Sequence, residues 1–155
     1  MQDYQTALGI WRRLPGDHRF ATAIVLDNIG YCQTLQKRLT DGIKTIEQAL
    51  TLAVEIDDRR TEAECRQDLA HAHLLAGDPD AARPFAEAAL ALAEAAGFRD
   101  ILQNSIYILG EVAALEGDDA ARDAHFARLQ TFFPEFPYLR DFLQMFDLSD
   151  ILTFH

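Results

Sequence analysis

Two short patterns recur in this chain at a fixed interval of 40 residues. In the first pattern, a large aliphatic residue directly precedes a tiny one at three places, Ile29-Gly30, Leu69-Ala70 and Leu109-Gly110. Further along each unit, the second pattern recurs at Ala49, Ala89 and Leu129. A fixed period of roughly 20 to 50 residues is typical of proteins built from stacked copies of one supersecondary unit. The sequence therefore predicts a repeat protein.

Helix breakers divide each unit into two helices joined by a short turn. Gly77-Asp78-Pro79-Asp80 and Gly117-Asp118-Asp119 have the residues of turns that end one helix and cap the next. Pro15-Gly16, Gly97 and residues 134–137 mark further helix ends, because proline removes a backbone donor and glycine accepts the left-handed conformation. No segment alternates like a strand. The pattern predicts an all-α fold with helices near residues 3–14, 19–37, 41–57, 60–76, 80–96, 99–116, 119–132 and 137–147.

Composition disfavours several classes of protein. The chain has 155 residues, of which 49% are hydrophobic and 25% charged, so one soluble domain is expected. A net charge of -11 repels phosphate backbones and anionic lipids, which disfavours binding to nucleic acid or to a membrane. Cys32 and Cys65 lie within apolar helical patterns, as free cysteines in a reducing compartment do. Residues 1–11 lack a basic segment followed by an apolar run, so we expect a cytoplasmic protein.

The middle unit resembles the tetratricopeptide repeat, whose pattern is W-x2-L-G-x2-Y, then A-x3-F, then P. It matches this pattern at Leu69-Ala70, Gly77-Asp78, Ala82-x3-Ala86 and Ala89-Leu90. The first unit matches at Leu26-x2-Ile29-Gly30, Gly42-x3-Ile46 and Ala49-Leu50. The third unit matches at Leu109-Gly110, Gly117-Asp118, Phe126 and Pro134. It departs at Arg122, where the pattern expects a small residue.

The resemblance implies antiparallel helical hairpins stacked as a right-handed α-solenoid. The expected organisation is a single domain, 1–155, with a half repeat at 3–17, repeats at 18–58, 59–98 and 99–134, and a capping helix at 135–155. Small residues at Gly30, Ala70 and Gly110 would let neighbouring helices approach closely. The interval of 40 residues exceeds the usual length of about 34. Such long repeats look like those of bacterial regulators and signalling adaptors.

Proteins of this kind bind other proteins along the concave face that the first helices line. The residues expected on that face are Ile24, Asp27, Tyr31, Thr34, Glu64, Gln67, His71, Leu74, Asn104, Tyr107 and Glu111. Carboxylates beside tyrosines suit a peptide with basic and apolar side chains, although a solvated face without a partner is the alternative. The chaperone-tail-binding subgroup has Lys, Arg and Asn where this chain has Asp27, Gln67 and Tyr107, so that subtype is disfavoured. The predicted function is a protein-interaction scaffold within a bacterial regulatory or signalling protein.

The two ends of the chain support a second hypothesis, self-assembly into a homodimer. Ala7, Ile10, Trp11 and Leu14 form an apolar face that needs cover. Either the chain is a fragment of a longer protein, or two copies share this edge. The tail has an apolar helical pattern at Tyr138, Leu139, Phe142, Leu143 and Phe146. We interpret the tail as a cap over the last repeat rather than as an exposed docking helix.

A small-ligand or metal sensor is the third hypothesis. Glu64, Asp68 and His71 share one helical face, with Cys65 and His73 nearby. No second cluster supplies further ligands, and His73 falls on the face that packs inside the hairpin, so packing or surface roles are favoured. No nucleophile elbow, phosphate-binding glycine loop or zinc-binding motif occurs. We therefore expect no metal, no cofactor and no catalytic residue, so the chain is not predicted to be an enzyme.

Overall fold

The computed structural model describes residues 6, 9–10, 16–137 and 139. Six helices and no strand lie within the full stretch 16–137, namely α2 (Arg19–Leu35), α3 (Leu39–Glu55), α4 (Arg59–Leu75), α5 (Pro79–Ala96), α6 (Arg99–Glu116) and α7 (Asp119–Gln130). The predicted all-α class is confirmed, and the six helices predicted between residues 19 and 132 have ends within two residues of those observed. The expected helices at 3–14 and 137–147, including Trp11 and most of the aromatic tail, fall largely outside the described residues.

The five turns between these helices share one backbone device. Each turn places one residue at positive φ, and these residues follow one another at intervals of 20, at Lys37, Asp57, Gly77, Gly97 and Gly117. The left-handed conformation ends a helix because it turns the chain away from the helical path, and glycine adopts it without steric cost. In the first two turns, where no glycine signals the stop, the predicted helices run two residues too far, to residues 37 and 57.

Aspartates start three of the helices. The carboxylates of Asp58, Asp78 and Asp118 accept hydrogen bonds from the backbone N–H three residues further on, at 3.3, 3.1 and 2.9 Å. Each carboxylate satisfies a donor that the first turn of a helix leaves without an intrahelical partner. The predicted capping turns at Gly77-Asp78 and Gly117-Asp118 are thus confirmed.

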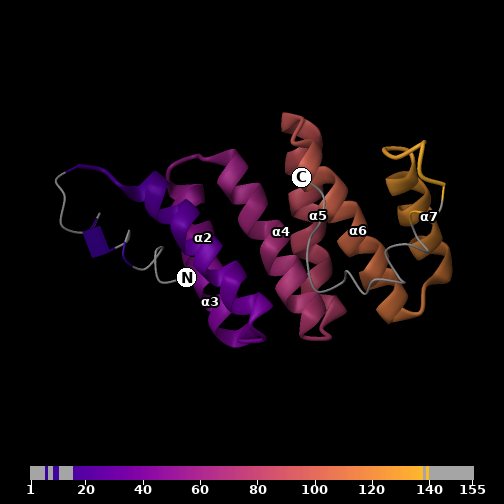
Figure 1. Ribbon diagram of the computed structural model, residues 1–155, viewed down its shortest axis with the longest axis horizontal. Helices are drawn as coiled ribbons and strands as arrows, with labels where there is room; N and C mark the ends of the chain where they lie inside the picture. The colour runs from indigo at the N-terminus through magenta and orange to yellow at the C-terminus, as the bar shows by residue number, and fades with distance from the viewer. Residues whose placement is uncertain (1–5, 7–8, 11–15, 138, 140–155) are drawn as a thin grey trace.

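The helices form three antiparallel hairpins, α2–α3, α4–α5 and α6–α7, which follow one another along the longest axis of the molecule (Figure 1). α4 contacts both α2 and α6, so these three helices form a continuous layer, which we call the inner helices. The outer helices α3 and α5 each pack between their own hairpin partner and the next inner helix. Stacking of this kind buries apolar surface that a single hairpin would leave exposed.

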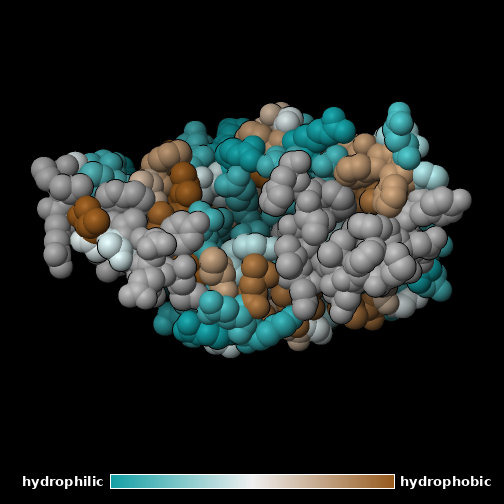
Figure 2. All heavy atoms as spheres, in the orientation of Figure 1, coloured by the Kyte–Doolittle hydropathy of each residue, from teal (hydrophilic) through white to brown (hydrophobic). Residues whose placement is uncertain are grey.

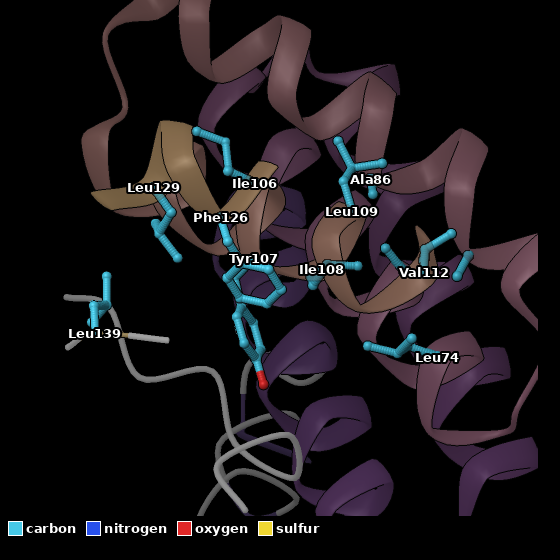
Figure 3. Packing of buried hydrophobic residues seen from close by; sticks show 12 residues of the cluster. Leu74, Ala86, Ile106, Tyr107, Ile108, Leu109, Val112, Phe126, Leu129 and Leu139 are labelled. Carbon is cyan, nitrogen blue, oxygen red and sulfur yellow. The ribbon is translucent and has the colours of Figure 1, made fainter. Parts of the chain in front are cut away.

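Burial differs between the two kinds of helix. The outer helix α5 buries a single stripe of small residues, Ala82, Ala86, Ala89 and Ala93, and exposes its other face. The inner helices α4 and α6 are buried on almost every side, because each contacts both helices of its own hairpin region and its neighbours in the layer. The largest cluster of buried side chains joins α6 to α7 and includes Ile106, Tyr107, Leu109, Phe126 and Leu129 (Figure 3).

Two glycines allow the closest contact between helices. A Cβ atom at Gly30 would lie 2.5 Å from the side chain of Ile46 and 2.9 Å from the carbonyl oxygen of Gly42. A Cβ at Gly110 would lie 3.0 Å from the ring of Phe126. Since real Cβ atoms essentially never lie that close to another heavy atom, only glycine fits at Gly30 without a shift of α3. The predicted role of Gly30 and Gly110 in helix approach is confirmed.

A search for membrane spans in the described part of the chain found no helix with the length and apolar character needed to cross a bilayer.

Candidate binding face on the inner helices

The residues predicted for the concave face all lie on α2, α4 and α6, the inner helices. Nine of them fall into three sets at the repeat interval, Ile24, Glu64 and Asn104, then Asp27, Gln67 and Tyr107, then Tyr31, His71 and Glu111. Each set takes one residue from each inner helix, and successive inner helices are in contact. On the face shown in Figure 2, hydrophilic side chains gather over α4, the middle helix of this layer.

The structure brings several of these residues together across the α2–α4 contact. The rings of Tyr31 and His71 lie with their centroids 6.0 Å apart and tilted by 39°. Tyr31, Glu64, Ile24 and Glu111 are half-buried, whereas His71 is fully buried. An aromatic pair that bridges two repeats provides a rigid contact surface with polar groups at its edge.

Three predicted residues are tied to the protein interior instead. Thr34 is fully buried, its hydroxyl donates to the carbonyl oxygen of Gly30, and its side chain lies against the α3 residue Gly42. Leu74 and Tyr107 belong to the largest buried cluster. Tyr107 packs edge-on against Phe126 of α7, with ring centroids 6.2 Å apart, while its hydroxyl points away from the labelled cluster (Figure 3).

A buried acidic pair lies between α2 and α4. Asp27 and Asp68 expose only 7% and 8% of their surfaces. Burial raises the pKa of Asp27 to about 7, the thiol of Cys65 opposes this shift, and the charge of Glu64 adds to it. Burial also raises the pKa of Asp68 well above its ordinary value, and the charge of Asp27 raises it further. The two carboxyl groups therefore compete for one negative charge near neutral pH.

Gln67 completes this buried polar group. Its Nε2 donates a hydrogen bond of 3.1 Å to Oδ1 of Asp68. The side chain is as deeply buried as the two aspartates, with 7% of its surface exposed. Its Oε1 and Oδ1 of Asp27 are buried without a hydrogen-bond partner. We call Asp27, Gln67 and Asp68 the acidic pocket.

A cation links α4 to α6 beside this pocket. Arg60 lies 2.9 Å from the carboxylate of Glu64 and 2.5 Å from that of Asp100, and its guanidinium lies over the ring of Phe98. Burial raises the pKa of Glu64, and the nearby charge of Arg60 partly offsets this shift. The sequence analysis missed this link, although Arg60 and Asp100 occupy equivalent positions in successive repeats, 40 residues apart. That equivalence is the signal by which the contact was predictable.

Asp68, His71 and His73 have roles other than those of a metal cluster. Among the residues that the structure describes, no group of three or more His, Cys, Asp or Glu side chains is placed to hold a metal ion. The ring of His73 stacks on that of Phe85 with centroids 5.7 Å apart, which confirms that His73 packs inside the α4–α5 hairpin. Asp68 was singled out from the sequence as a metal ligand and not as a member of the binding face. In the structure it lies beside Gln67 and acts on Asp27.

Successive helical hairpins with a continuous layer of inner helices define the class of helical-repeat scaffolds. A family model for the tetratricopeptide repeat matches residues 22–95, which span α3, α4 and most of α2 and α5. The chain belongs to the tetratricopeptide repeat family, as the resemblance predicted. Comparisons with curated proteins and with solved structures found no match. The family is a non-catalytic fold that binds other proteins or peptides.

Proposed function

We propose that the face formed by the inner helices binds a basic segment of another protein. The observation that carries this proposal is the alignment of polar and aromatic residues from three successive repeats across helices that touch one another. A solvated outer helix shows the opposite pattern, because α5 buries only its alanine stripe and exposes its charged side chains. On the inner helices, by contrast, polar groups such as Asn104, Gln103 and His71 are buried.

The charge of the chain favours a basic partner. The net charge is -11, and the inner face carries Asp27, Glu64, Asp68 and Glu111. Only Glu64 of these four has an ion pair with an arginine that the structure describes, and Glu111 has other contacts. Opposite charge on a partner speeds its approach and fixes its register in the groove. Tyr31 and Ile24, both half-buried, supply apolar contact area beside the carboxylates.

Selection of short random peptides against the full chain tests this proposal. We expect the selected peptides to be enriched in Lys and Arg, and their affinity to fall by about 10-fold or more between about 50 mM and about 300 mM salt. Tyr31→Ala combined with Glu64→Gln should weaken the best peptide by about 10-fold. Peptides of random charge, or binding that ignores salt, would contradict the proposal.

A matched control separates loss of the face from loss of charge. Glu47→Gln combined with Glu55→Gln removes two negative charges from exposed positions of the outer helix α3. This variant should keep peptide affinity within about 2-fold of the wild type at physiological salt. Thermal unfolding of each variant shows whether a loss of binding reflects a loss of fold.

A second candidate function, self-association, is favoured by an exposed aromatic residue. Phe20, at the start of α2, exposes 59% of its surface beside a hollow of about 600 Å³ that Ile56 and Asp58 also line. An aromatic side chain of this exposure gains free energy when a second copy covers it. Sedimentation of dilute protein tests this candidate, because Phe20→Ser should shift a dimer towards the monomer. A wild-type protein that is monomeric throughout the concentration series would reject it.

A further inference from the structure

The acidic pocket presents hydrogen-bond acceptors that lack donors. Oδ1 of Asp27 and Oε1 of Gln67 are buried and have no hydrogen-bond partner. The orientation of the Gln67 amide follows from its neighbour, since its Nε2 donates to Oδ1 of Asp68. Leaving a buried polar atom without a partner costs about 1–3 kcal/mol, so such atoms are rare in folded proteins and need an explanation.

The same two aspartates also lack a cation. Elsewhere in the described structure, carboxylates on the helices pair with arginines, as Glu62 does with Arg66 at 2.7 Å and Glu94 does with Arg128 at 2.5 Å. Neither Asp27 nor Asp68 forms an ion pair with any described Lys, Arg or His. The most deeply buried carboxylates of the inner face are thus the ones for which the described chain supplies no counter-charge. A buried carboxylate without a counter-charge is costly.

We infer that the acidic pocket of Asp27, Gln67 and Asp68 is a receptor for the guanidinium group of one arginine side chain of the partner segment. This inference rests on the proposed function, because it assigns a site within the same face. It names the partner residue that would fix the position of the segment against the α2–α4 contact.

Guanidinium fits the pocket better than ammonium does. Guanidinium is planar, carries five N–H donors in a fixed arrangement and is more weakly hydrated than the ammonium of lysine. The pocket supplies an amide oxygen and two carboxyl groups from adjacent helices, all nearly excluded from solvent. A strongly hydrated point charge would lose more solvation on entering such a site and would satisfy fewer of its acceptors at once.

Binding should release a proton. The groups that act on the pair are Glu64 and Cys65 of α4 together with the two aspartates and Gln67, and no described group on α3, α5 or α6 shifts either carboxyl. Because burial raises the pKa of Asp27 to about 7, the free pocket holds a proton near neutral pH. A bound cation lowers the pKa of both carboxyl groups and expels that proton. Affinity for the cation therefore rises with pH between about 6 and about 8.

Titration of the full-length protein with N-acetyl-arginine methylamide, followed by NMR of backbone amides, tests the pocket independently of any peptide. The matched probes are the citrulline analogue, which has the same shape without the charge, and the lysine analogue. We expect saturable shifts at residues 27, 67 and 68 with the arginine probe, none with citrulline, and an affinity that increases several-fold from about pH 6 to about pH 8. Asp27→Asn combined with Asp68→Asn should remove the response, whereas Glu47→Gln combined with Glu55→Gln should preserve it.

The outcomes separate this inference from the proposed function. Equal shifts with citrulline, tighter binding of the lysine probe, or a response that survives the double Asn variant would each overturn the arginine pocket. If selected basic peptides bind the inner face while the arginine probe fails in these ways, the pocket is rejected and the binding face stands. If the arginine probe responds as expected while no peptide binds, the face is rejected as a groove and the pocket stands.

Discussion

Gly30 of α2 and Gly42 of α3 lie so close together that a Cβ atom on either one would be 2.9 Å from the carbonyl oxygen of the other. This reciprocal contact brings the two backbones of the first hairpin together near the middle of α2. Thr34 and Ile46, which follow each glycine by one turn, fill the space on either side. The contact sets how α2 meets α3, and so how α2 presents Asp27 and Tyr31 to α4.

Gly30→Ala should destabilise the protein by about 1–3 kcal/mol, because the added methyl group collides with backbone and with Ile46. The gain in helix propensity from Gly to Ala, about 1 kcal/mol, is too small to offset this collision. Gly110→Ala should cost less, since its methyl group meets the ring of Phe126 rather than backbone. Urea unfolding measures both free energies, and equal or reversed costs would show that the backbone contact is not the limiting one.

The turns offer a test of the 20-residue spacing. Lys37 stands at φ 61° where three later turns have glycine. Lys37→Gly should stabilise the protein by roughly 0.5 kcal/mol, because glycine removes the left-handed strain at some cost in unfolded-state entropy. Gly77→Ala, at φ 72°, should destabilise it by about 1 kcal/mol. Thermal unfolding of the pair would contradict this account if both changes moved stability in the same direction.

Loss of a helix cap gives a third prediction. Asp78→Ala and Asp118→Ala each remove a carboxylate that accepts a backbone N–H at the start of a helix. Each change should cost about 1 kcal/mol of unfolding free energy. Arg38→Ala provides the comparison, because Arg38 occupies the same position before α3 without a capping side chain. A cost at Arg38 as large as at Asp78 would place the effect elsewhere than in the cap.

The sequence predicted the fold well because helix breakers and apolar spacing are local signals. Gly97 and Gly117 marked their turns correctly, whereas Lys37 and Asp57 were missed because neither residue type favours positive φ. The binding face was predicted less completely, since the side on which a residue lies depends on its neighbours in space. Thr34 followed the expected helical spacing, yet its hydroxyl bonds within α2 and its side chain packs on α3.

The acidic pocket shows the same limit more sharply. Asp68 is an ordinary acidic residue in the sequence, and only the α2–α4 contact places it near Asp27 and away from solvent. No local pattern reports that two carboxyl groups 41 positions apart share a buried environment. The repeat interval relates Asp27 to Gln67, so an offset of one further residue had no expected meaning.

Burial of the pair also predicts how stability depends on pH. The pKa of Asp27 is about 7 in the folded protein and about 3.8 unfolded, so the folded state binds a proton more tightly between these values. The stabilising contribution of this proton is complete below about pH 4 and is lost as the pH rises towards 7. Asp68 acts in the same direction.

Asp27→Asn should therefore stabilise the protein relative to wild type by about 2–4 kcal/mol at pH 8, and by much less at about pH 4.5. The amide imitates the neutral acid, so it avoids the cost of a buried charge. Chemical unfolding at the two pH values measures the difference, with Glu47→Gln as the control that should stay parallel to wild type. A difference that does not change with pH would show that Asp27 titrates as an exposed group does.

The central claim is that the inner helices hold a basic segment of a partner, and hydrogen exchange of the full chain with and without a selected basic peptide tests it most directly. The account predicts added protection of backbone amides in α2, α4 and α6, with α3 and α5 unchanged on their exposed faces, and loss of that protection in the Tyr31→Ala, Glu64→Gln variant. Protection confined to the outer helices, or unaltered by that variant, would contradict it.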